Sequence, residues 1–226
     1  MRQRMNERTM MCAVGILLFL FAVPASASDA MLDRSRTQSE DLDANQINYI
    51  HARFNEVTQD LFLIPEINSI VDYVSGSSND HAFVNNINGL NDTIAINVVL
   101  LHSHGGSTSL SFKDGSHLYA GEVDNWMDDR NRGFMFAGAC SSARHTDLGN
   151  AFIDKGFDTF FGYENTVLTL HNARFYAAFF DLATFVNVEV SEAARYAGDE
   201  VEEEFGSADD VRDSRFIGNS SLCLRT

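Results

Sequence analysis

The strongest constraint on the fold of this chain is an almost unbroken run of apolar, mostly β-branched residues at positions 94–101. Such a run is typical of a strand that is buried on both faces of a parallel sheet. Similar runs cover residues 133–139 and 157–163. Segments with helical spacing lie before, between and after them. The sequence therefore predicts an α/β three-layer sandwich, with a mainly parallel central sheet and helices on both faces.

Helices are predicted where apolar residues recur every three or four positions. This pattern predicts helices over residues 47–61, 67–74, 82–90, 121–129, 147–155, 170–186 and 190–205. Alternation on both sides of Asp114-Gly115 predicts a hairpin over residues 109–119. Residues 215–218 are expected to form a short edge strand.

The first 27 residues have the features of an export signal. Three arginines precede an apolar run at residues 14–23, and small residues follow at positions 25 and 27. The apolar run is nearer ~10 residues than the ~20 that a spanning helix needs, so we expect a cleaved signal peptide rather than a membrane anchor. Cleavage after Ala27 would make the protein secreted or periplasmic.

The remaining chain is predicted to form a loose arm followed by one domain. Residues 28–46 are polar and lack an apolar period, so we expect a flexible N-terminal arm. Residues 47–226 are expected to form a single domain. The formal net charge of −16 makes nucleic acid and anionic membrane surfaces unsuitable partners, because like charges repel.

Two reactive side chains stand at the ends of the first two strands. His104 is followed by Gly105 and Gly106, and Cys140 follows the second strand. The carboxyl ends of neighbouring parallel strands share one edge of a sheet, so we expect these side chains to lie near each other. An imidazole beside a thiol activates it for acyl transfer, and backbone N–H groups at Gly105 and Cys140 would stabilise an oxyanion. His102 shares the strand face of His104, so alternation does not decide which histidine pairs with Cys140.

The order of these motifs resembles the caspase-like (clan CD) cysteine peptidases, which include caspases, metacaspases, gingipains, clostripain and the CHAT domains. The resemblance covers residues 94–198 and includes strand–His104-Gly105 and strand–Ala139-Cys140. It implies a caspase-like fold and a cysteine endopeptidase that acts on a protein or peptide. It further implies a catalytic dyad of His104 and Cys140, with Gly105 in the oxyanion site. This chemistry needs no metal and no organic cofactor.

The sequence departs from this family in two places. The family usually has two strands before the segment equivalent to residue 94, whereas the pattern here predicts helices, so we expect a reduced sheet. No acidic residue immediately precedes Cys140, as it does in metacaspases. Glu164 and Asp147 are the candidates for a pocket that binds a basic substrate side chain, and ordinary loop or helix-cap roles are the alternative for both.

Other chemistries use the same residues. In an exported chain, Cys140 and Cys223 are candidates for a disulfide. His102 and His104 are spaced as in metal-dependent hydrolases, with His117, Cys140, His145 and His171 as further ligand candidates. Residues 138–142 distantly resemble a nucleophile elbow, with His171 and Asp158 or Asp181 as partners. A caspase fold that serves as a non-catalytic binding or scaffold module is a further alternative.

Overall fold

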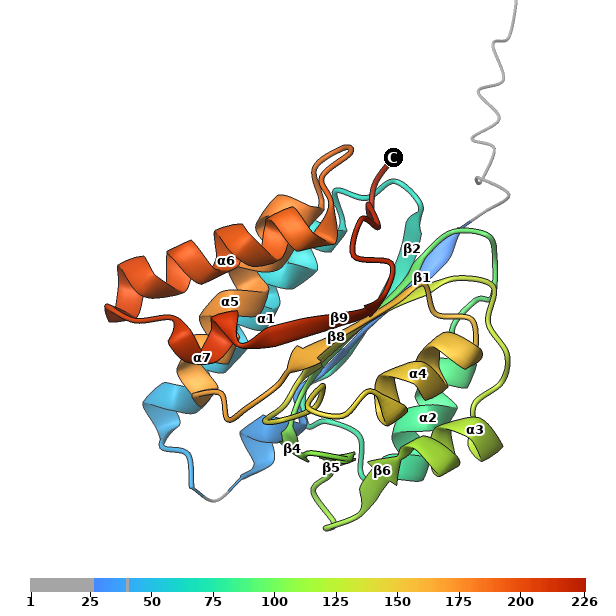
Figure 1. Cartoon of the computed structure of the whole chain (residues 1–226), viewed down its shortest axis with the longest axis horizontal. Helices are drawn as coiled ribbons and strands as arrows, with labels where there is room; N and C mark the ends of the chain where they lie inside the picture. The colour runs from blue at the N-terminus through green and yellow to red at the C-terminus, as the bar shows by residue number, and fades with distance from the viewer. Residues whose placement is uncertain (1–26, 40) are drawn as a thin grey trace, which may run out of the picture.

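The computed structural model describes residues 27–39 and 41–226, and Figure 1 shows how its elements are arranged. The strands are β1 (Ser28–Asp33), β2 (Ile67–Tyr73), β3 (Asn97–His102), β4 (His104–Gly106), β5 (Ser109–Ser111), β6 (His117–Tyr119), β7 (Gly133–Gly138), β8 (Thr159–Tyr163) and β9 (Ser214–Gly218). The helices are the 3-10 helix η1 (Ser35–Gln38), α1 (Ala44–Leu61), α2 (Asp80–Asn88), α3 (Ala120–Trp126), α4 (Asp147–Asp154), α5 (Thr169–Ala183), α6 (Val190–Phe205) and α7 (Asp209–Arg212).

The central sheet has six strands in the order β2-β1-β3-β7-β8-β9. All neighbouring pairs are parallel except β8 and β9, which are antiparallel. Helices α1, α5 and α6 cover one face, and α2, α3 and α4 cover the other (Figure 1). The predicted α/β three-layer architecture with a mainly parallel sheet is confirmed.

Strand β3 shows why the first apolar run is nearly continuous. Val98 and Leu100 belong to the core beneath α1 and α5. Val99 and Leu101 belong to the core on the opposite face. Because successive side chains of a strand point to opposite faces, a strand covered on both sides is mainly apolar at successive positions, and its polar residues Asn97 and His102 stand at its two ends.

A layer of aromatic rings fixes the sheet against α5. Phe161 on β8 stacks on Phe175, with ring centroids 5.5 Å apart, and Phe136 on β7 meets Phe179 edge-on at 5.4 Å. All four rings are buried, and burying each one contributes on the order of 2–3 kcal/mol. This layer gives strands β7 and β8 a rigid support.

The prediction of a loose arm over residues 28–46 is wrong. Residues 28–33 form β1, a buried strand between β2 and β3. Its polar residues are satisfied from distant parts of the chain. The amide of Asp29 donates to Asn97, and the amide of Asn91 donates to the carboxylate of Asp29. Asp33 accepts from the amides and hydroxyls of Ser35 and Ser77.

The second helix predicted before residue 94 is also a strand. Residues 67–73 form β2, which pairs with β1 at the edge of the sheet. The sheet is therefore not reduced, contrary to the sequence-based expectation. The helix-like spacing of Ile67, Ile70 and Val71 arises because β2 is only partly buried on both of its faces.

The predicted hairpin is confirmed and gains a third strand. Strands β5 and β6 are antiparallel, and β4, directly after β3, pairs with β5 to make a separate three-stranded sheet.

The signal-peptide prediction falls on residues 1–26, outside the described residues apart from Ala27, and remains a prediction. Among the residues that the structure describes, no helix combines the length and apolar character needed to cross a membrane.

Candidate active site at the carboxyl edge of the sheet

One pocket at the carboxyl edge of the sheet contains both predicted catalytic side chains. The pocket has a volume of about 220 Å³ and is lined by residues that include Arg36, His102, His104, Cys140, Val167 and Asn172. They come from η1, the end of β3, the start of β4, the turn after β7 and the segment that enters α5. The site therefore unites segments that lie more than a hundred residues apart in the chain.

Cys140 lies in a tight turn immediately after β7. The next residue, Ser141, has a φ of +55°, a left-handed conformation that is uncommon for a residue with a side chain. The turn is held by hydrogen bonds from the amide of Ser141 to Asn165 and from the amide of Ala143 to Tyr163, 2.8 and 2.9 Å long. No hydrogen bond among the described residues uses the Cys140 amide. That amide therefore remains available to a ligand.

The Cys140 thiol contacts the segment that enters α5. Its sulfur donates to the carbonyl of Val167 at 3.5 Å. Asn172 on α5 supports the same region, because its amide donates to the carbonyl of Gly138 and its oxygen accepts from the buried hydroxyl of Tyr163. Asn172 thereby ties the end of β7 to β8 beneath the thiol.

His104 is held by η1 and the residue after it. Its Nε2 lies 3.0 Å from Nη1 of Arg36 and 3.0 Å from the hydroxyl of Ser39. Burial lowers the pKa of His104, and the neighbouring Arg36 guanidinium lowers it further. The neutral imidazole is therefore favoured at this position.

Arg36 is fixed in the pocket by several partners. Its two terminal nitrogens donate to the carboxylate of Asp41 at 2.7 and 2.8 Å, and Nε donates to Thr169 at 3.3 Å. The Arg36 contact lowers the pKa of Asp41 to about 2. Sequence reasoning did not identify Arg36, because residues 28–46 were expected to be a loose arm.

Gly105 lies directly against the cysteine turn. A Cβ at this position would be 2.8 Å from both the carbonyl oxygen of Cys140 and the side chain of Ala139. Any larger residue would displace one of the two segments, so the position requires glycine. The predicted role of the Gly105 backbone in an oxyanion site remains a prediction.

His102 borders the same pocket but is almost completely buried. Its ring stacks on Phe54 and meets Tyr176 edge-on, and its Nδ1 has no partner among the described residues. Burial lowers its pKa to about 3, so the ring is neutral. Within residues 27–39 and 41–226, no group of three or more His, Cys, Asp and Glu side chains is arranged to hold a metal ion. His102 and His104 therefore lack a third metal ligand in this part of the chain.

The two candidates for substrate binding lie elsewhere. Glu164 forms an ion pair with Arg215 of β9. Asp147 is exposed in the first turn of α4. Neither lines the pocket that contains Cys140, where the strongly charged side chain is the cation Arg36. The expected pocket for a basic side chain is therefore not formed by these residues.

The residues of the proposed nucleophile elbow are not assembled around Cys140. His171 pairs with Asp210 at 2.9 Å and lies outside the Cys140 pocket. Asp158 forms an ion pair with Arg132, which directly precedes β7. This pair therefore lies at the amino end of β7, whereas Cys140 follows its carboxyl end. These contacts give no support to a serine-hydrolase-like arrangement.

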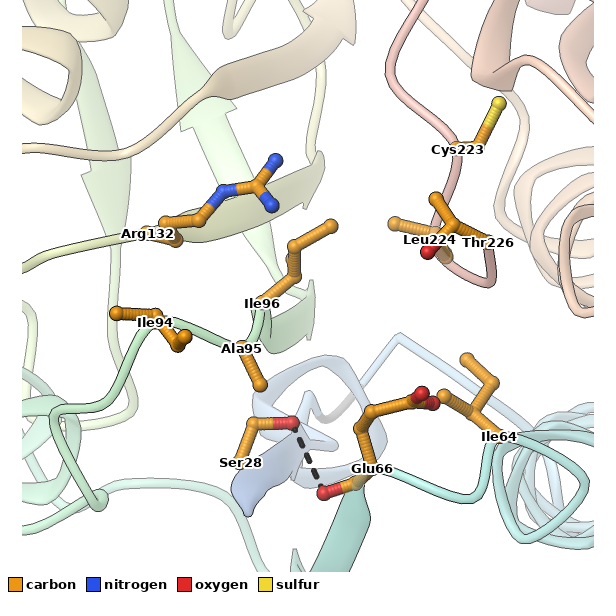
Figure 2. A pocket seen from close by; sticks show the side chains of 10 residues that line it. All are labelled: Ser28, Ile64, Glu66, Ile94, Ala95, Ile96, Arg132, Cys223, Leu224 and Thr226. Atoms are coloured by element: carbon orange, nitrogen blue, oxygen red, sulfur yellow. Dashed lines mark hydrogen bonds between the residues drawn. The ribbon is translucent and has the colours of Figure 1, made fainter. Parts of the chain in front are cut away.

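Cys140 and Cys223, the cysteines within the described residues, lie at opposite ends of the sheet. Cys223 borders a hollow of about 180 Å³ at the amino ends of the strands, together with Ser28, Glu66 and Arg132 (Figure 2). Both cysteines are free thiols. Since Cys140 follows the carboxyl end of β7, this placement argues against a Cys140–Cys223 disulfide.

Comparison with known sequences identifies a relative that matches most of the chain. No protein-family model matches the chain. An uncharacterized protein from Archaeoglobus fulgidus is 45% identical over 186 residues, which cover 79% of this chain and 95% of that protein. The chain belongs to the same family as this archaeal protein.

Comparison with solved structures identifies the fold. The Arg-specific cysteine proteinase gingipain R superposes with a TM-score of 0.62 at 13% identity, over 88% of this chain. The complex of the RgpB pro- and mature domains of Porphyromonas gingivalis gives 0.62 at 14% identity, over 90% of this chain. The chain spans about half the length of these proteins, 47% and 50%. The chain thus has the caspase-like fold of gingipain R.

Proposed function

We propose that this protein is an exported, caspase-like cysteine endopeptidase. The observation that carries the proposal is the single pocket that contains Cys140 and His104, with Gly105 packed against the cysteine turn. The fold of gingipain R, a cysteine proteinase, supports the same activity. Export rests on the signal-like residues 1–27 and follows from the sequence alone.

The mechanism follows from the chemistry of a thiol and an imidazole. His104 takes the proton from Cys140, and the thiolate attacks the carbonyl carbon of the scissile peptide bond. The negative charge that develops on the carbonyl oxygen is stabilised by the free amide of Cys140 and by the Gly105 backbone. His104 then gives its proton to the leaving amine, and a water molecule hydrolyses the thioester.

This mechanism predicts which variants of the protein hydrolyse peptides. The full chain should hydrolyse members of a fluorogenic peptide library, and Cys140→Ala and His104→Ala should each abolish hydrolysis. Cys223→Ala is the matched control, since that thiol lies at the other end of the sheet, and should retain activity. Loss of hydrolysis in Cys223→Ala but not in Cys140→Ala would refute the proposal.

A non-catalytic binding module is the second candidate. It is favoured by one observation: the Cys140 thiol donates to Val167 and His104 accepts from Arg36, so these two side chains are each bonded to another residue. The module would bind peptides in the same pocket without cleaving them. A peptide that binds the full chain and the Cys140→Ala variant equally, and is recovered intact from both, would favour this candidate.

A further inference from the structure

The contact between Arg36 and His104 determines which imidazole nitrogen carries the proton. A guanidinium has only donors, so Nε2 of His104 must accept from Arg36 across their 3.0 Å contact. The hydroxyl of Ser39, also 3.0 Å from Nε2, then donates to the same atom. In a neutral imidazole with Nε2 as acceptor, the proton is on Nδ1.

The thiol that His104 would deprotonate is bonded elsewhere. Sγ of Cys140 donates to the carbonyl of Val167, and no hydrogen bond joins Cys140 to His104 among the residues placed by the structure. The neutral ring has one lone pair that can accept a proton, on Nε2, and this lone pair already accepts from Arg36 and Ser39. His104 therefore has no means of accepting the thiol proton in this arrangement.

We propose that Arg36, assisted by Ser39, is a positioning residue that holds His104 in a resting state, in which Nε2 is unable to accept the thiol proton. This inference rests on the proposed function of Cys140 and His104. When the Arg36 contact breaks, Nε2 becomes free. The thiol proton then passes from Sγ to Nε2, which leaves a thiolate and an imidazolium.

The surroundings of Arg36 explain how the resting state is maintained. Its side chain is 8% exposed, whereas that of its partner Asp41 is 62% exposed. The bidentate contact with Asp41 and the bond to Thr169 aim the guanidinium at the pocket. Helix η1 itself is anchored by Asp33, which accepts hydrogen bonds from Ser35 at its first position. Both the side chain of Arg36 and the helix that carries it are therefore held in place.

Other charged groups face His104 from the surrounding elements. Asp41 opposes the charge of Arg36, while buried His102 and the thiol of Cys140 lie in the same pocket. Lys113 of the β5–β6 hairpin borders the hollow on the other side of His104, but its ammonium donates to Gln38. Lys113 therefore supplies a matched control: a cation close to His104 without a bond to it.

The test measures the rate of alkylation of Cys140 by iodoacetamide between pH 5 and 9, followed by mass spectrometry. The full chain is compared with Arg36→Met, Ser39→Ala, Lys113→Met, His104→Gln and the double variant Arg36→Met/His104→Gln. Alkylation of Cys223 is the internal reference, and circular dichroism confirms that each variant is folded.

Release of His104 should make the thiol more reactive. For Arg36→Met we expect alkylation at pH 7 to rise about five- to tenfold, because an imidazolium partner lowers the pKa of the thiol while the intrinsic nucleophilicity falls slightly. Ser39→Ala should give about a twofold rise, as one of two donors is lost. Lys113→Met should leave the rate unchanged.

The double variant separates this effect from the direct electrostatic effect of removing a cation near the thiol. In the His104→Gln background, Arg36→Met should give no rise. An equal change in both backgrounds, or an unchanged or lower alkylation rate in the single Arg36→Met variant, would overturn the proposal. Alkylation does not depend on peptide hydrolysis. A chain that fails to cleave any peptide, yet shows the predicted rise, would refute the peptidase function and leave the resting state in place.

Discussion

The backbone of Gly105 lies against the carbonyl oxygen of Cys140, where a Cβ would be only 2.8 Å from that oxygen. The strand that begins at His104 and the turn that carries the thiol are therefore packed without space for a side chain between them. This packing sets the relative position of the two candidate catalytic residues.

Gly105→Ala should consequently impair hydrolysis more than folding. The added methyl group must displace the Cys140 turn, which should lower kcat/KM at least tenfold, and overpacking should cost about 1–3 kcal/mol of stability. Gly121→Ala is the control, because a Cβ on that residue of α3 would have no neighbour within 4 Å. Peptide hydrolysis and urea unfolding would measure both effects. An active Gly105→Ala variant would show that the close packing is unimportant.

The charge of the pocket predicts a substrate preference. Arg36 is the strongly charged side chain in the pocket beside Cys140, and neither Glu164 nor Asp147 reaches it. We expect peptides with Arg or Lys next to the scissile bond to be cleaved less efficiently than peptides with neutral or acidic residues there, by roughly tenfold, since like charges repel in a partly desolvated site. Rapid cleavage of peptides with Arg at that position would contradict this expectation.

Asp60 near the end of α1 predicts a pH-dependent stability. Partial burial, together with the neighbouring Asp181 and Glu56 carboxylates, raises its pKa from 3.8 to about 6. A raised carboxyl pKa favours folding at pH values below 3.8, and this contribution is lost as the pH rises through 6. Asp60→Asn should therefore stabilise the protein by about 1 kcal/mol at pH 8, after allowance for solvent screening, and by little at pH 4. Urea unfolding at both pH values would measure this difference. An equal effect at both would contradict the account.

The buried side chain of Asn97 should be important for stability because it joins β1 to β3. It accepts from the amide of Asp29 and donates to the carbonyl of Asn91. Asn97→Ala would leave both groups without a partner and should cost about 2 kcal/mol. Asn131→Ala, which removes one exposed side-chain hydrogen bond to Asp92, should change the free energy of unfolding by less than about 0.5 kcal/mol. A similar loss of unfolding free energy in the two variants would contradict the importance of the Asn97 link between β1 and β3.

The elements that sequence reasoning predicted well are those with a clear local pattern. Strands β3, β7 and β8 are buried on both faces and read as apolar runs, and α5 shows apolar residues at helical spacing. The positions of His104, Gly105 and Cys140 followed from the ends of such runs. Their chemical roles remain a proposal, because position alone does not establish a reaction.

The elements that were missed depend on distant partners. Strand β1 contains Asp29 and Asp33, which resemble loop residues until Asn97, Asn91 and Ser77 are known to satisfy them. Arg36 was missed for the same reason. It lies in η1, and η1 reaches the carboxyl edge of the sheet because it directly follows strand β1. A buried polar residue bonded to a remote segment leaves no periodic signal in the sequence.

The central claim is that Cys140 is a nucleophile assisted by His104, and trapping with a peptidyl acyloxymethyl ketone library tests it most directly. Such reagents form a stable thioether with a catalytic cysteine after the peptide has occupied the site. Intact-mass and peptide analysis of the treated full chain should reveal one adduct, located on Cys140. The adduct should be absent in Cys140→Ala, greatly reduced in His104→Gln and unchanged in Cys223→Ala. An adduct on Cys223, or none on any residue, would contradict the claim.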